Sequence, residues 1–159
     1  IILLKLIHNY DVIIPSRRYY VIDTIRSQYN NAHYGADLKK LELIIAELMP
    51  EYSTSFNTVM NRRFMTPYNI FFMGNQNFKS YCSWLFELLF KLEESLVLKD
   101  YPSDQIRVFG FLAERLFNVW LEKNKNILKI KELPIISIEG DNLFLKGVNL
   151  LKRKYLLTR

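Results

Sequence analysis

The chain has 159 residues, of which 50% are hydrophobic and 14% aromatic, and its formal net charge is +6 at pH 7. This composition supplies one domain with a buried core and excludes an intrinsically disordered chain. A net positive charge is compatible with binding of nucleic acid. However, the arginine pairs at 17–18 and 62–63 belong to no recognised nucleic-acid motif. We therefore expect no nucleic-acid partner.

Cysteine usage and the N-terminus indicate the compartment. Cys82 is the only cysteine, so a disulfide framework is excluded and a reducing cytoplasm is the simpler interpretation. The opening IILLKLIHNY lacks the features of a secretory signal and is too short to span a bilayer. Because the chain starts without methionine and within an apolar pattern, we expect it to be part of a larger protein.

Hydrophobic periodicity predicts helices around a few short strands. The predicted elements are, in chain order, a helix ending at 9, a strand at 12–14, helices at 21–31, 38–49 and 55–63, a strand at 67–74, helices at 78–98 and 101–124, a strand at 133–139 and a helix at 142–157. Gly35 is expected to end the helical segment before it, and Asp37 is expected to cap the third helix. The predicted class is α+β, mostly helical, with residues 1–159 forming a single domain.

The helix predicted over 101–124 carries polar residues on an otherwise apolar surface. Spacings of three and seven residues place Arg107, Gly110 and Glu114 on one stripe, which Asn118 extends. Charged groups on a largely covered helix must be paired or face a wet cavity. The stripe therefore predicts a ligand cleft, with the glycine giving access to the backbone. The alternative is a solvent-facing stripe whose glycine lets another helix pack closely.

Other familiar sites are missing from the sequence. It contains no G-x-G-x-x-G motif and no Walker loop, and its two histidines and one cysteine do not have zinc-ligand spacing. Dinucleotide, P-loop and zinc-finger chemistry are therefore not predicted.

Three blocks of the sequence together resemble a known family. They are YDVIIPSRRYYVIDTIRSQYNNAHYGADL, NRRFMTPYNIFFMGNQNFKSYCSWLFELLFKLEE and DQIRVFGFLAERLFNVWL, within about residues 9–124. In order and spacing they resemble a bacterial glycosyltransferase family of capsular and exopolysaccharide gene clusters, long catalogued as a domain of unknown function. The resemblance implies a GT-A-like fold of which this chain is the C-terminal part.

The resemblance implies further roles for individual residues. His33 and Tyr34 are candidate contacts to a donor or acceptor sugar, and Asn69 resembles an asparagine that opens a strand near the donor sugar. Trp84 is a candidate platform for stacking against a sugar face. The alternatives are that His33 has a structural role, that Asn69 is a turn residue at a strand edge, and that Trp84 packs in the core.

On the same basis, the polar stripe would face the substrates. Arg107 would neutralise the diphosphate with its forked guanidinium, and Gly110 would leave room for the ligand. Glu114 is the candidate catalytic residue, as general base or as a ligand of sugar hydroxyls.

The resemblance also implies partners and a cofactor. The donor would be a nucleotide-sugar, with a UDP-sugar expected, and the acceptor a hydroxyl of a lipid-linked glycan. A divalent cation, Mn or Mg, would be bound by an acidic D-x-D motif, which this sequence lacks. That motif is expected upstream of this chain.

Residues 140–159 form a basic amphipathic tail. Its cationic residues are Lys146, Lys152, Arg153, Lys154 and Arg159, and no acidic residue follows Asp141. Such a helix can lie on an anionic membrane surface, so the protein would be cytoplasmic and located at the inner face of the cell membrane. The alternatives are a packed terminal helix and a dimer contact.

The sequence is also compatible with a second class of protein. In this alternative, the chain is a non-catalytic helical domain that binds a protein or a membrane. A D-x-D motif earlier in the same gene would favour the transferase, whereas a gene that starts at Ile1 would favour the binding domain.

Overall fold

The structure, a computed structural model, describes residues 2–135. Its helices are α1 (Ile2–Asn9), α2 (Ile25–Ala32), α3 (Gly35–Leu48), α4 (Ser53–Asn61), α5 (Asn75–Glu93) and α6 (Val108–Asn124), with single 3₁₀ turns η1 (Pro50–Tyr52) and η2 (Leu98–Asp100). Its strands are β1 (Val12–Pro15), β2 (Arg18–Tyr19), β3 (Phe64–Met65), β4 (Phe72–Met73) and β5 (Ile130–Leu133). The fold is α+β and mostly helical, as predicted.

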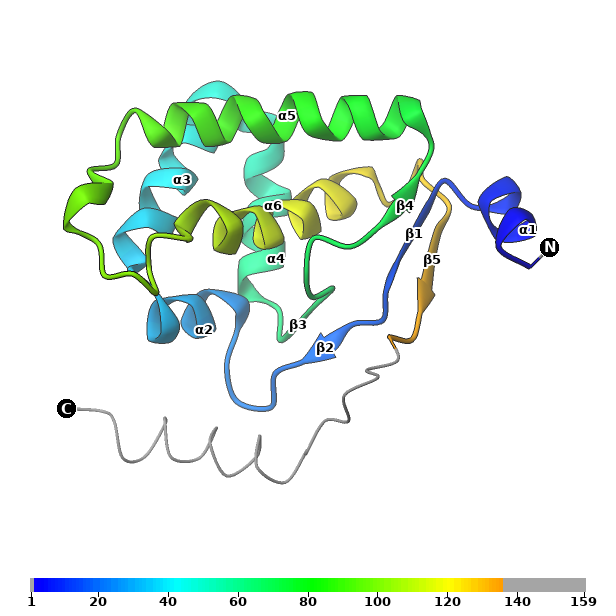
Figure 1. Cartoon of the computed structure of the whole chain (residues 1–159), viewed down its shortest axis with the longest axis horizontal. Helices are drawn as coiled ribbons and strands as arrows, with labels where there is room; N and C mark the ends of the chain where they lie inside the picture. Colours follow the sequence, from blue (N-terminus) through cyan, green and yellow to red (C-terminus); the bar gives the residue numbers. More distant parts are fainter. Residues whose placement is uncertain (1, 136–159) are drawn as a thin grey trace.

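The strands form two small sheets at one side of the helices (Figure 1). β1 is the central strand of the larger sheet, where it pairs antiparallel with β4 and parallel with β5. Its residue Val12 lies opposite both Met73 and Ile130 and is fully buried. β2 and β3 form a separate antiparallel ribbon, which leads the chain from the sheet into α2.

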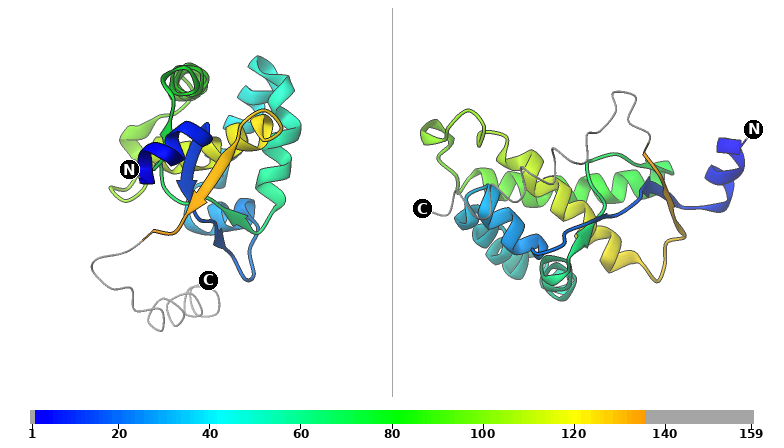
Figure 2. Two further views of the ribbon diagram at one scale, coloured as in Figure 1. Left: turned by 90° about the vertical axis from the view of Figure 1, so that its right-hand side faces the viewer. Right: turned by 90° about the horizontal axis from the view of Figure 1, so that it is seen from below.

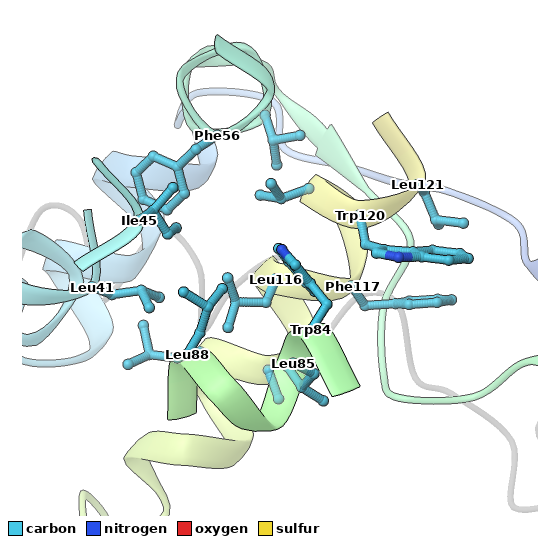
Figure 3. Close-up of a cluster of buried hydrophobic side chains, with 14 of the residues drawn as sticks. Leu41, Ile45, Phe56, Trp84, Leu85, Leu88, Leu116, Phe117, Trp120 and Leu121 are labelled. Atoms are coloured by element: carbon cyan, nitrogen blue, oxygen red, sulfur yellow. The ribbon is translucent and has the colours of Figure 1, made fainter. Parts of the chain in front are cut away.

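The core lies between α3, α4, α5 and α6. α5 runs along one side of α6, and α4 packs against α6 as well (Figures 1 and 2). The buried side chains of these helices meet in one cluster, in which Figure 3 labels Leu41, Ile45, Phe56, Trp84, Leu85, Leu88, Leu116, Phe117, Trp120 and Leu121. Burial of this apolar surface is the main stabilising term. The described residues therefore share one hydrophobic core.

Two predicted helices have different starts in the structure. α3 begins at Gly35 itself, and Asp37 lies within its first turn, where its buried carboxylate accepts a 2.7 Å hydrogen bond from the Tyr101 hydroxyl. The helix predicted over 101–124 begins only at Val108. Before it, the amides of Gln105 and Ile106 both donate to the Pro102 carbonyl in a turn, so Arg107 precedes the helix.

The strand predicted over 67–74 is wrong in extent, because only Phe72–Met73 is paired. Tyr68 has a φ of 65°, in the left-handed region, and this bends the chain before it can enter the sheet. The strand predicted over 133–139 overlaps β5 only at Leu133, and residues 136–139 lie outside the described residues. The helix predicted over 142–157, and with it the basic tail, also lies outside them.

Candidate functional site

The predicted polar stripe of Arg107, Gly110 and Glu114 lies along the N-terminal half of α6. Its residues become less exposed toward the C-terminal end of the helix. Arg107 is exposed at the N-cap, Gly110 is exposed in the first turns, and the Glu114 side chain is 31% exposed. A Cβ atom added to Gly110 would meet nothing within 4 Å. Described residues therefore leave open space at Gly110, and no helix packs against it there.

Asn118 does not extend this open stripe, which corrects the sequence analysis. It is 1% exposed, and its side chain bonds to both backbone groups of Thr66. The reason is that α6 passes beneath the segment that follows β3. Only Arg107, Gly110 and Glu114 thus reach the surface.

His33 is brought to the same face of the molecule by the end of α2. It is the C-cap residue of that helix, and its ring stacks on Phe111 of α6 with 4.0 Å between the ring centroids. The Arg107 guanidinium lies 5.8 Å from the centroid of the same Phe111 ring. Two residues predicted from separate segments, His33 and Arg107, therefore meet around one aromatic ring.

Gln105 determines the tautomer of His33, and burial determines its charge. The Gln105 amide nitrogen donates to Asp104 and to the Ala32 carbonyl, so its Oε1 atom accepts from His33 Nδ1 at 3.0 Å. Burial lowers the pKa of His33 below its ordinary value of 6.5, and Arg115 lowers it further, while Gln105 and Asp104 oppose the change. His33 is therefore neutral at pH 7 and has Nε2 as its acceptor.

A shallow open hollow of about 330 Å³ lies beside His33, between the end of α2 and the turn before α6. Asn31, His33, Tyr34, Asp104 and Gln105 contribute its polar and aromatic lining. Tyr34 is 44% exposed, and its ring meets the Tyr101 ring edge-on at 5.1 Å. The hollow thus combines an aromatic surface with hydrogen-bonding groups.

Below the stripe, a buried arginine holds α6 against α2. Arg115 is 4% exposed; it donates to the Phe111 carbonyl at 2.7 Å and to Gln28 Oε1 at 2.6 Å. Its guanidinium lies 5.0 Å from the centre of the Tyr29 ring, and the Glu114 carboxylate is 3.5 Å from it. Burial lowers the pKa of Arg115 and Glu114 opposes this. Arg115 and Glu114 thus form an ion pair at the inner edge of the stripe.

The other two predicted site residues lie elsewhere. Asn69 is exposed in the bend after Tyr68, and no hydrogen bond or aromatic contact of the described residues joins it to α6. Trp84 is 7% exposed and packs against Tyr52 at 4.7 Å in the core (Figure 3). A sugar face cannot reach a covered ring, so the structure supports the core alternative for Trp84. The structure brings His33 and Arg107 together around Phe111 and places Tyr34 beside His33 in the hollow. Gly110 and Glu114 lie farther along α6.

In residues 2–135, no group of three or more His, Cys, Asp or Glu side chains is placed to hold a metal ion. The described helices include none that is long and apolar enough to cross a membrane.

A second hollow, of about 170 Å³, lies beside the C-terminal half of α6. Its charged groups are already paired, as Arg62 and Lys125 bond to Glu122 at 3.1 and 2.6 Å, and Arg17 to Glu132 at 2.7 Å. Because each of these charged groups already has an ion-pair partner, we interpret this hollow as a structural contact between α6 and the sheet.

Three residues of the site were not foreseen from the sequence: Gln105, Phe111 and Arg115. Phe111 and Arg115 lie in the apolar run of α6, where nothing distinguishes the ring that His33 covers from the other core aromatics. Arg115 has one local signal, since a charge between Leu112 and Leu116 falls on the buried side of the helix. Gln105 has none, because its partner His33 lies at the end of α2, 72 residues earlier in the chain.

The fold and this site can now be compared with known proteins. A family model described as a domain of unknown function (DUF4422) matches residues 2–125, and the chain belongs to this family. No curated protein matches the chain in sequence. Among solved structures, the chain is similar to one titled "WbbM bifunctional glycosytransferase apo structure", with a TM-score of 0.77 and 29% sequence identity. The match covers 82% of this chain and 24% of that chain, so this chain spans about a quarter of the solved protein.

Proposed function

We propose that this chain is part of a glycosyltransferase that moves a sugar from a nucleotide-sugar to a hydroxyl of a surface-polysaccharide acceptor. The observation that carries the proposal is the structural match to a protein titled a bifunctional glycosyltransferase, at a TM-score of 0.77 and 29% identity. Identity at this level over most of the chain supports a shared chemistry as well as a shared fold. The exposed stripe on α6 offers candidate residues for the contacts to the substrates.

In this proposal the stripe and its neighbours line the substrate cleft. Arg107 is exposed at the start of α6 beside the Phe111 ring, where a forked guanidinium can bind a diphosphate in two-point geometry. The Glu114 side chain is 31% exposed, so its carboxylate is accessible to an acceptor hydroxyl as general base. The space at Gly110 admits the ligand between these two residues.

The partners follow from the same proposal. The donor would be a UDP-sugar and the acceptor a lipid-linked capsule or exopolysaccharide glycan at the cytoplasmic face of the cell membrane. A divalent cation, Mn or Mg, would be held by residues outside the described ones. Basic side chains such as Arg107 would then add to the stabilisation of the leaving diphosphate.

The test uses the full-length protein that contains this chain. It is incubated with each of the common UDP-sugars and a lipid-linked acceptor, and sugar transfer and UDP release are both measured. Transfer from at least one donor is the expected result. Absence of both transfer and UDP release across the donors would overturn the proposal and favour a non-catalytic binding domain.

A further inference from the structure

α5 has an apolar surface that the described residues leave open. The helix runs along one edge of the molecule (Figures 1 and 2), and its Phe86 and Phe90 side chains are 47% and 62% exposed. Their rings stack on each other, with 5.7 Å between the centroids. We propose that this surface binds a second copy of the same chain, with the two α5 helices antiparallel. The inference goes beyond the proposed function and does not depend on it.

The open side of α5 has the residue spacing of a seam between two paired helices. The seam consists of Lys79, Cys82, Phe86, Leu89 and Glu93, which follow one another at intervals of three, four, three and four residues. Such intervals place side chains on one line of a helix, and two helices pack along each other through lines of this kind. All five side chains are exposed or partly exposed. The seam is therefore apolar in the middle and charged at both ends.

The two end charges determine the orientation of the pair. Lys79 and Glu93 each lie seven residues from Phe86, in opposite directions along the helix. Two antiparallel helices related by a two-fold axis at Phe86 would place Lys79 of each copy opposite Glu93 of the other. A parallel pair would instead place like charges opposite each other, and these would repel. Charge complementarity thus favours a second copy in the antiparallel orientation.

Neither end charge has a partner within its own chain. Lys79 and Glu93 take part in none of the salt bridges of residues 2–135. They lie about 21 Å apart along the helix axis, at 1.5 Å per residue, so they cannot pair with each other. By contrast, Lys91 and Glu94 lie off the seam and pair within one copy at 2.8 Å.

The helix dipole favours the same orientation. Glu93 is the last residue of α5, where the negative end of the dipole disfavours a carboxylate, and the first turn of α5 contains no acidic residue. In the antiparallel pair, Glu93 of one copy would lie near the positive N-terminal end of the other helix. Each copy would thus supply the charge that the other lacks.

The experiment is sedimentation equilibrium of the full-length protein over a series of concentrations, which gives its mass in solution. We expect a dimer. Phe86→Glu should abolish it, because two carboxylates would then be buried against each other at the two-fold axis. Leu43→Glu is the matched control, since Leu43 is 58% exposed and lies on α3, outside the seam. Thermal unfolding establishes that each variant is folded.

Charge reversal tests the orientation. Lys79→Glu and Glu93→Lys should each weaken dimerisation by about tenfold or more, because each creates two like-charge contacts in the dimer. The variant that carries both changes should dimerise like the wild type, since both ion pairs form again with their signs exchanged. Lys99→Glu and Glu51→Lys make the same charge changes at exposed positions outside α5 and should have no effect.

Three results would contradict the inference. A wild-type protein that is monomeric throughout the series would overturn it and indicate that another part of the longer protein covers the seam. A dimer that persists in Phe86→Glu and in both charge reversals would place the interface on another surface. A dimer that is lost in the single reversals but not restored in the double variant would reject the antiparallel pairing. Because the mass is measured without a sugar donor, none of these results bears on the proposed function.

Discussion

Asn118 fastens α6 to the segment after β3 by bonding to both backbone groups of Thr66. Its Oδ1 atom accepts from the Thr66 amide at 2.8 Å, and its Nδ2 atom donates to the Thr66 carbonyl at 2.9 Å. Both residues are at most 3% exposed. The Asn118 side chain thus makes the two hydrogen bonds that a neighbouring strand would otherwise make with the backbone of Thr66.

The first prediction follows from this contact. Asn118→Ala leaves two buried backbone groups of Thr66 without partners, each at about 1–3 kcal/mol. We expect the free energy of unfolding, measured by urea denaturation with circular dichroism, to fall by about 2–4 kcal/mol. The control Asn57→Ala, at an exposed position in α4, should change it by less than about 0.5 kcal/mol. A loss as small as that of the control would mean that water replaces Asn118.

The second prediction concerns Gly110. Gly110→Ala adds a methyl group that meets nothing within 4 Å, so the fold should be kept and the helix stabilised by up to about 1 kcal/mol. If the stripe lines the substrate cleft, the same methyl group should lower turnover of the full-length enzyme by about tenfold or more. Ser83→Ala, at an exposed position in α5, is the control. Greater stability with wild-type turnover would show that nothing approaches Gly110.

Sequence periodicity predicted the helices whose formation depends mainly on covering one apolar face. α5 was predicted because Tyr81, Leu85, Leu88 and Leu92 recur at helical spacing, and all four are buried. A stripe of this kind depends only on local spacing and on the need to cover apolar surface.

The site itself depends on contacts between distant segments, which periodicity does not encode. His33, Arg107 and Glu114 were foreseen as individual residues, but their arrangement required Phe111 between the first two and the turn at Pro102 that excludes Arg107 from α6. The choice between a sugar platform and a core position for Trp84, and the burial of Asn118, could not be decided from the sequence for a related reason. Polar or amphipathic side chains can end in the core when their groups are satisfied or covered there, and that depends on tertiary packing.

The third prediction concerns Glu114. Glu114→Gln keeps the shape of the side chain but removes its charge, so a general base is lost and turnover of the full-length enzyme should fall by about 100-fold or more. Its part-exposed position predicts only a small change in unfolding temperature. Glu87→Gln, exposed on α5, is the control for charge removal. Wild-type turnover in Glu114→Gln would exclude Glu114 as the base.

The fourth prediction is a pH dependence of stability. The pKa of His33 is lowered in the folded state, so between pH 6.5 and that lower pKa the unfolded chain binds more protons than the folded one. Stability should therefore be full above pH 6.5 and fall as the pH decreases through this range. His33→Gln should lessen the fall between pH 7.5 and 5.5, as measured by urea denaturation. The same fall in His33→Gln and in the wild type would contradict the assignment.

The last prediction concerns the basic tail, which lies outside the described residues. Lys152, Arg153 and Lys154 are consecutive, and each cation near an anionic bilayer contributes about 1 kcal/mol of binding. Replacing all three by glutamine should therefore weaken co-sedimentation of the full-length protein with phosphatidylserine-containing vesicles by about tenfold or more, and added salt should weaken the wild type similarly. A triple control, with glutamine at the exposed Lys79, Lys99 and Lys129, removes the same charge from other surfaces. If both triple variants lose binding equally, net charge rather than the tail attracts the membrane; if neither does, the tail is a packing element.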